Sequence, residues 1–118
     1  MEGHRDLEVW QKAMQFVTDV YLVTQAFPRE ELYGLSSQLR RAAVSVPSNI
    51  AEGCGRSSKK EFSQFLCHAR GSLLEVETQL EIAQNLGYLP VKRVRELLLK
   101  SNRIGRMLNG LRSWCQAA

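Results

Sequence analysis

Hydrophobic residues recur at helical spacing along almost the whole chain. They step by three or four positions, and no stretch shows the alternation and turn residues of a β-hairpin. This pattern predicts four helices and no strands. The expected helices cover residues 7–26, 33–54, 59–86 and 90–114. Because short links join them, the pattern predicts an all-α fold, an antiparallel up-down four-helix bundle that occupies residues 1–118 as one domain.

Capping residues mark the ends of these segments. We expect Asp6 to cap the start of the first helix. Ser58, with Glu61 three residues later, has the spacing of a capping box and marks the start of the third helix. Gly87 is expected to end that helix in a left-handed conformation, and Pro90 is placed to open the fourth.

The second expected helix contains an internal proline, Pro47. Proline removes one main-chain hydrogen bond and clashes with the preceding turn, so the helix either stops near Val46 or continues with a kink. The apolar stripe continues past Pro47 without a break, which favours a helix kinked at Pro47. We expect Gly53 and Gly55 to end it.

The composition is that of an ordinary globular protein. Hydrophobic residues make up 44% of the 118 positions and charged residues 24%, which argues against a disordered chain and against a membrane protein. The three cysteines, Cys54, Cys67 and Cys115, lack the spacing of a disulfide framework. The first residues lack the features of an export signal. These features predict a cytoplasmic protein that does not associate with membranes.

Positive charge is concentrated in the last predicted helix. The formal net charge is +4, but residues 90–118 alone hold seven basic residues and a single acidic one, Glu96. At about 100° per residue, most of these cations fall within an arc of about 160°, opposite the apolar stripe of the same helix. The cations expected to contact nucleic acid are Lys92, Arg93, Lys100, Arg103 and Arg106. A secondary basic set consists of Arg40, Arg41, Arg56, Lys59 and Lys60.

A basic helix face is compatible with several roles. It binds RNA or DNA through phosphate attraction without reading base sequence, or it binds an acidic protein, or it is simply solvated. Attachment to an anionic membrane is disfavoured, because this helix has a full apolar stripe to bury in the bundle. We favour nucleic acid. Leu99, Met107 and Trp114 lie on the basic side of the helix, and we expect them to contact another subunit.

The sequence shows no catalytic constellation. Residues 53–60 combine glycines, cations and a helix start, but they follow a helix rather than a strand and lack the spacing of a phosphate-binding loop. The Glu-x-x-His pattern of a di-iron bundle is absent, and His4 and His68 have no metal-ligand spacing. Neither Cys67 nor Cys115 sits in a nucleophile motif. We therefore expect no enzymatic activity, no metal and no cofactor.

Polar residues follow the flanks of the two central helices. If these flanks meet, they form a polar seam beside the apolar core, which either fixes helix register or binds a ligand. We favour the structural role, because buried polar groups need partners, and such a seam offers partners to the main chain that Pro47 leaves unbonded. The seam would consist of Ser45, Asn49, Glu52, Ser72, Glu75 and Gln79.

Several short motifs resemble a known family over about residues 5–90. The most specific is Val-Pro-Ser-Asn-Ile-Ala-Glu-Gly at residues 46–53. Others are Asp-Leu-Glu-Val-Trp at 6–10, Arg-Ser at 56–57, Lys-Glu-Phe at 60–62, Phe-Leu at 65–66, Ala-Arg-Gly-Ser-Leu-Leu-Glu at 69–75 and Leu-Gly-Tyr-Leu at 86–89. Together they resemble the four-helix-bundle proteins encoded within 23S ribosomal RNA intervening sequences.

This resemblance carries expectations about assembly and partners. Proteins of this group are antiparallel four-helix bundles that assemble into a barrel-shaped homopentamer. A more distant relative is the accessory variability determinant of diversity-generating retroelements, which associates with a reverse transcriptase and with nucleic acid. The resemblance therefore implies a homo-oligomer, with a pentamer favoured, that binds RNA or DNA. It also implies a reverse transcriptase or another protein as a partner.

Overall fold

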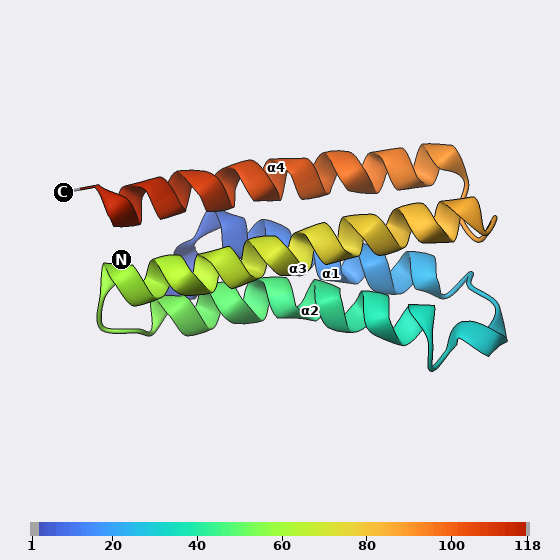
Figure 1. The fold of residues 1–118 in the computed structure, drawn as a ribbon, viewed down its shortest axis with the longest axis horizontal. Helices are drawn as coiled ribbons and strands as arrows, with labels where there is room; N and C mark the ends of the chain where they lie inside the picture. The colour runs from blue at the N-terminus through green and yellow to red at the C-terminus, as the bar shows by residue number, and fades with distance from the viewer. Residues whose placement is uncertain (1–2, 118) are drawn as a thin grey trace.

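Four α-helices joined by short turns make up the computed structural model, which describes residues 3–117 (Figure 1). They are α1 (Glu8–Thr24), α2 (Leu35–Cys54), α3 (Lys59–Asn85) and α4 (Val91–Gln116). Short 3-10 segments at His4–Asp6 and Arg29–Glu31 precede α1 and α2. The described residues contain no strand, so the predicted all-α four-helix fold is confirmed.

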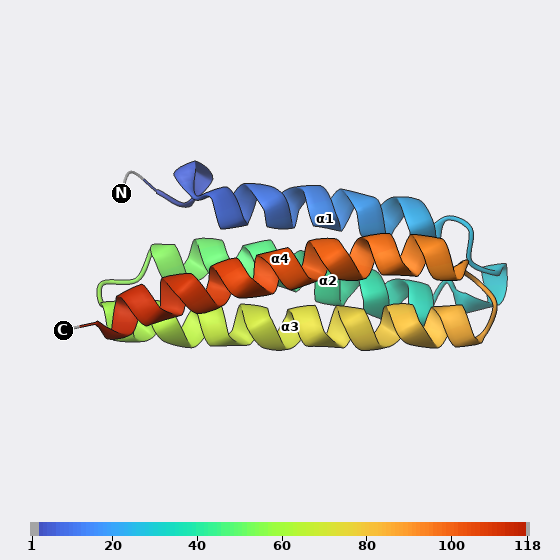
Figure 2. The same ribbon diagram turned by 90° about the horizontal axis from the view of Figure 1, so that it is seen from above.

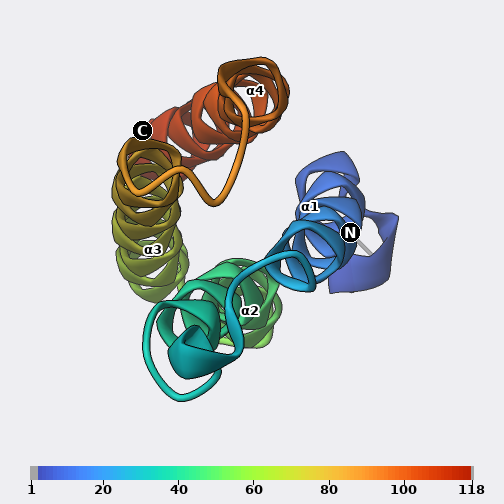
Figure 3. The same cartoon turned by 90° about the vertical axis from the view of Figure 1, so that its right-hand side faces the viewer.

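The helices follow one another around the bundle in chain order. The two views in Figures 2 and 3 show α1 beside α2, α2 beside α3, α3 beside α4, and α4 returning to the side of α1. The contact between α2 and α3 is the most extensive, and that between α1 and α4 is the smallest of the four. The bundle is elongated, 47 × 24 × 20 Å. The α1–α4 seam is therefore its least packed side.

One apolar stripe from each helix points into a common core. Burying a large apolar side chain contributes about 1.5–3 kcal/mol relative to leaving it in water, so the meeting of four stripes drives assembly. The largest fully buried side chains include Phe16, Leu39, Ile50, Leu66, Leu73, Leu80, Leu97, Ile104 and Leu108. No helix within residues 3–117 has both the length and the apolar character needed to cross a bilayer.

The expected signals at the two ends of α3 are confirmed, whereas the expected cap of α1 is not. At α3, the Glu61 main-chain N–H donates to Ser58 Oγ at 3.1 Å, and Ser58 Oγ donates to Glu61 Oε1 at 3.3 Å. Gly87 adopts the expected left-handed conformation with φ 80°. The cap expected at Asp6 is wrong, because Leu7 occupies the capping position of α1 and no side chain caps it. The partly buried Leu7 packs against the core, which leaves Asp6 one residue too early in a 3-10 turn.

The helix α2 continues through Pro47, which is buried. The kink at Pro47 stays a prediction. The role expected of Gly53 is wrong, because it lies inside α2 and does not break the helix. A Cβ atom added at Gly53 would lie 2.6 Å from Phe65 Cβ, so this glycine allows close packing of α2 on α3. The helix ends at Cys54, and Gly55 follows with an ordinary right-handed φ of −82°.

Candidate nucleic-acid interface

The cations of α4 define what we call the α4 basic face: Lys92, Arg93, Arg95, Lys100, Arg103 and Arg106. All except Arg93 are exposed. Two members are engaged in ion pairs. Arg93 Nη1 lies 3.0 Å from Glu96 Oε2 one turn along α4, and Lys100 Nζ lies 2.8 Å from Asp19 Oδ2 on α1.

The partner of Lys100 comes from another helix. Within the sequence of residues 90–118, Glu96 is the single acidic neighbour of the basic face. The structure adds Asp19, which α1 places opposite Lys100 across the least packed seam. Asp19 therefore partly neutralises the α4 basic face beside Lys100. Other exposed cations of the face, such as Arg95 and Arg106, have no ion-pair partner within residues 3–117.

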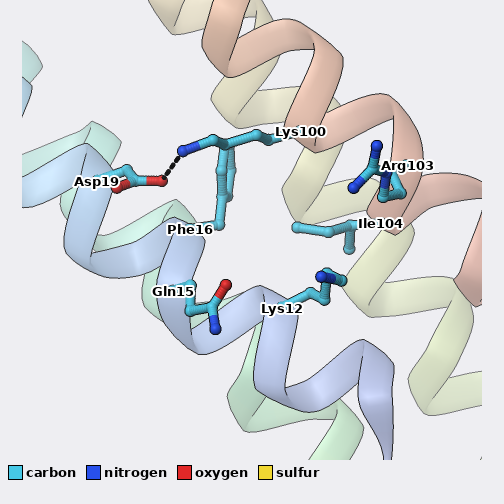
Figure 4. Close-up of a pocket in the computed structure, with 7 residues that line it drawn as sticks. All are labelled: Lys12, Gln15, Phe16, Asp19, Lys100, Arg103 and Ile104. Carbon is cyan, nitrogen blue, oxygen red and sulfur yellow. Dashed lines mark hydrogen bonds and ion pairs between the residues drawn. The ribbon is translucent and has the colours of Figure 1, made fainter.

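A pocket of about 180 Å³ lies in the α1–α4 seam beside this ion pair (Figure 4). Figure 4 shows Lys12 and Gln15 reaching in from α1, while Lys100 and Arg103 come from α4. Phe16 and Ile104 form its apolar floor. Lys12 is not among the site residues predicted from the sequence. Lys12 lies four residues before the core residue Phe16, so helical spacing places it beside the apolar stripe of its helix. Which helix packs opposite Lys12 depends on the tertiary fold and cannot be predicted from this spacing.

The secondary basic set does not form one surface. Arg40 packs between α1 and α2, where its Nε donates to Thr24 Oγ1 at 2.7 Å and its guanidinium lies 4.8 Å from the centre of the Tyr21 ring. Arg41 is exposed on α2, which lies diagonally across the bundle from α4 (Figure 3). Neither arginine extends the α4 basic face.

The remaining cations of that set lie at the α2–α3 turn, next to the end of α4. Lys59 Nζ lies 4.2 Å from the centre of the Trp114 ring, and the Arg56 guanidinium lies 4.8 Å from that of Phe65. Lys60 is exposed and lines a shallow hollow between α3 and α4 together with Arg112. Arg112 Nε is buried without a hydrogen-bond partner in the described part of the chain.

The residues of the expected polar seam meet only at its centre. The Ser45 and Ser72 hydroxyls lie 2.8 Å apart across the α2–α3 contact, and Asn49 Nδ2 donates to Ser45 Oγ at 2.9 Å. Asn49 Nδ2 also donates to the Ser45 carbonyl at 2.8 Å. Its hydrogen bonds therefore go to Ser45 and not to the Ala43 carbonyl, which Pro47 leaves without its helical donor. The role of the seam toward the main chain at Pro47 stays a prediction.

The two ends of the seam do not join this centre. Glu52 is exposed, and its carboxylate has no hydrogen-bonded partner among residues 3–117. Gln79 Nε2 donates to Glu75 Oε2 at 3.4 Å within α3, while Gln79 Oε1 is buried without a partner there. The seam is therefore a short serine–asparagine contact rather than a continuous polar channel.

The apolar residues expected to contact another subunit are in different environments. Leu99 is 65% exposed, and by helical spacing it lies one turn from both Arg95 and Arg103. Met107 packs against the core and, with the half-exposed Trp114, lines an apolar hollow between α4 and the start of α1. Leu99 is therefore the most exposed of these three side chains, and it lies among the cations of α4.

Comparison with known proteins connects this architecture with one family. The fold is similar to a solved structure from Bacteroides thetaiotaomicron, described as a protein of unknown function from the S23 ribosomal protein family. The TM-score is 0.81 at 23% sequence identity, and the match covers 89% of this chain and 95% of the other. A comparison with curated proteins gave no match.

The sequence itself matches a family described as 23S rRNA-intervening sequence protein, over residues 5–110. This range includes the motifs of the first three helices and extends through most of α4. The distant relation to the retroelement protein stays a prediction. The chain belongs to the 23S rRNA-intervening sequence protein family.

Proposed function

We propose that this protein is a non-enzymatic, homo-oligomeric bundle that binds RNA or DNA through phosphate contacts on the α4 basic face. The observation that carries the proposal is the set of exposed cations on one side of α4, with Glu96 as the single acidic residue of that segment. Such a face attracts a polyanion without reading its bases. The family description refers to 23S rRNA, which makes a structured RNA the first ligand to test.

The test compares two double variants that each remove two positive charges. Arg95→Gln/Arg106→Gln removes two exposed arginines from the α4 basic face, and Arg5→Gln/Arg29→Gln removes two exposed arginines from elsewhere. Binding of a structured RNA is measured by fluorescence anisotropy over a series of salt concentrations. We expect the first variant to weaken binding and to reduce the salt slope by about 0.7–0.9 for each phosphate that the protein no longer neutralises. The second should stay close to the wild type.

Equal effects of the two variants would mean that only net charge matters, and the assignment to α4 would be wrong. If the wild type fails to bind RNA at moderate salt, an acidic protein partner becomes the better explanation of the face. The exposed Leu99 among the cations favours that alternative, because apolar contact adds little to phosphate binding. It predicts a discrete acidic protein partner that is retained on the protein after nuclease treatment.

An exposed apolar surface between α1 and α2 supports the proposed homo-oligomer. Met14 is 44% exposed and Val44 39% exposed, and both line a hollow of about 310 Å³ between α1 and α2. Its lining contains no Asp, Glu, Lys or Arg. Because Leu99 lies among cations that the proposal assigns to nucleic acid, we place the subunit contact at this uncharged hollow.

Light scattering coupled to size exclusion tests this assignment. We expect a particle of about five times the 13.4 kDa chain mass, the pentamer that the family resemblance implies. Met14→Glu should reduce that mass, whereas Leu99→Glu should leave it unchanged. The opposite result would move the contact to α4, as predicted for Leu99, Met107 and Trp114.

A further inference from the structure

The pocket in the α1–α4 seam holds more positive charge than its surroundings neutralise. Lys12, Lys100 and Arg103 line it, and Asp19 is the only carboxylate among its lining residues. Asp19 pairs with Lys100, while the side chains of Lys12 and Arg103 have no ion-pair or hydrogen-bonded partner within the described residues. Like charges gathered around one pocket repel one another, so an anion that enters the pocket stabilises this arrangement.

The size and floor of the pocket limit what this anion is. Its volume of about 180 Å³ is below the roughly 300–1,000 Å³ of pockets that enclose drug-sized ligands. It therefore accommodates a single anionic group rather than a whole nucleotide. Phe16 and Ile104, both almost fully buried, close the pocket from the core side, so the charged groups meet the anion in a partly desolvated place.

The donor groups around the pocket suit a phosphoryl group. An arginine guanidinium presents a planar fork of N–H donors that matches two phosphate oxygens, and the two lysines add compact positive charges. Gln15 adds a neutral amide to the same lining. Four side chains on two helices offer more donors than the two oxygens of a carboxylate require. A phosphoryl group has more oxygens and more negative charge than a carboxylate, so it suits these donors better.

We propose that this pocket is a phosphate seat, in which Arg103, Lys12 and Lys100 bind one phosphoryl group. Asp19 holds Lys100 while the seat is empty and competes with the incoming anion. The inference deepens the proposed function. The phosphoryl group belongs either to the backbone of a bound nucleic acid or to free phosphate, and only the first of these sources rests on the proposed function. A backbone phosphate held here would anchor the nucleic acid at the α1 edge of the α4 basic face.

Inorganic phosphate is the first probe, titrated into the full chain at constant ionic strength. Binding is monitored by the NMR signals of Phe16 and Ile104, which form the floor. We expect saturable shifts in the wild type and an affinity reduced about tenfold or more in Lys12→Gln, which removes a charge-assisted hydrogen bond. Arg5→Gln removes an exposed cation that neither lines the pocket nor belongs to the α4 basic face, and it should bind phosphate as the wild type does.

Asp19→Asn provides a test of opposite sign. It removes the competing carboxylate, so phosphate should bind more tightly than to the wild type, which a merely structural ion pair does not predict. This variant also keeps the proposal testable if Lys12→Gln fails to fold. The proposal of a phosphate seat is wrong if the wild type shows no saturable phosphate binding. It is also wrong if Lys12→Gln and the wild type bind phosphate with equal affinity.

A parallel titration with structured RNA identifies the source of the phosphoryl group. If the seat holds a backbone phosphate, Lys12→Gln weakens RNA binding and inorganic phosphate competes with RNA. If RNA binding is unaffected while phosphate binding is abolished, the seat serves free phosphate. If the wild type binds inorganic phosphate and no RNA, the proposed function is wrong, whereas the result supports the phosphate seat.

Discussion

At the scale of single residues, Gly53 allows α2 and α3 to pack closely. A Cβ at this position would lie 2.6 Å from Phe65 Cβ and 3.0 Å from Phe62 Cδ1, so a neighbouring ring or backbone has to shift. We expect Gly53→Ala to lower the free energy of unfolding by about 1–3 kcal/mol through overpacking. Urea denaturation monitored by circular dichroism measures this change.

Gly71→Ala is the matched control for this prediction. Gly71 is exposed inside α3, and no atom lies within 4 Å of a Cβ added there. Because alanine is the better helix former, the control should raise stability by about 0.5–1 kcal/mol. Equal effects of the two substitutions would show that Gly53 is not a packing site.

Two cysteines on neighbouring helices should differ in reactivity. Cys67 is exposed on α3, and Cys115 is buried on α4. Burial raises the pKa of the Cys115 thiol, an effect that the nearby Lys59 charge only partly opposes. Since the thiolate is the reactive form, iodoacetamide at mildly alkaline pH should modify Cys67 well before Cys115. Mass spectrometry of the peptides over time measures the order, and equal rates in the folded protein would contradict it.

At the scale of helices, the start of α3 depends on Ser58. Its hydroxyl accepts the Glu61 main-chain N–H, a donor that otherwise has no partner within the helix. We expect Ser58→Ala to cost about 1 kcal/mol of stability. Ser57→Ala serves as the control, because the Ser57 hydroxyl contacts only the exposed Glu61 carboxylate, at 3.5 Å. Its effect should stay within about 0.5 kcal/mol in either direction, and a larger destabilisation than for Ser58→Ala would contradict the cap.

The helices could be predicted from the sequence because their signals are local. An apolar stripe needs only the spacing along one segment, and the cap of α3 needs only the four residues from Ser58 to Glu61. Gly53 was misjudged because glycine ends many helices, and only the position of Phe65 on another helix shows its packing role. The same limit applies to the candidate site. Its α4 cations were visible in one segment, but Lys12 and Asp19 join them across a seam that no local pattern describes.

At the scale of the whole molecule, one carboxylate ties together two turns at the same end of the bundle. Glu31 Oε2 accepts a hydrogen bond from the Tyr88 hydroxyl at 2.9 Å, and Glu31 Oε1 accepts the Leu35 main-chain N–H at 3.1 Å. The bond to Glu31 is the main reason why the pKa of Tyr88 is raised above its ordinary value of 10.0. Partial burial and the negative charges of Glu31 and Glu30 act in the same direction.

This shift predicts how stability changes at alkaline pH. The folded protein retains the Tyr88 proton at a pH where the unfolded chain releases it, so the stabilisation is complete below pH 10 and declines as pH rises through the raised pKa. Tyr88→Phe should therefore be less stable than the wild type at neutral pH, and the difference should shrink above pH 10. Tyr33→Phe, at a side chain 92% exposed, is the control and should show no such convergence. Urea denaturation across this pH range measures the difference.

The unequal packing between helices predicts that the bundle opens first at α1. The α2–α3 pair shares the most extensive interface, whereas α1 meets α4 over the smallest one and α4 packs more extensively on α3. Local opening occurs where it exposes the least buried surface, so amides of α1 should exchange with deuterium faster than those of the middle of α3. The middle of α3 is the internal reference, because Leu66, Leu73 and Leu80 are fully buried there.

Anions that occupy the α1–α4 seam should slow this opening. A ligand that binds only the closed bundle stabilises it by an amount that grows with the logarithm of its concentration above Kd, so phosphate well above Kd should slow exchange in α1 and leave the fastest amides at the helix ends unchanged. Lys12→Gln should abolish the effect. If phosphate protects α1 and α3 equally, the bundle opens as one unit, and the small α1–α4 interface has no separate role in its dynamics.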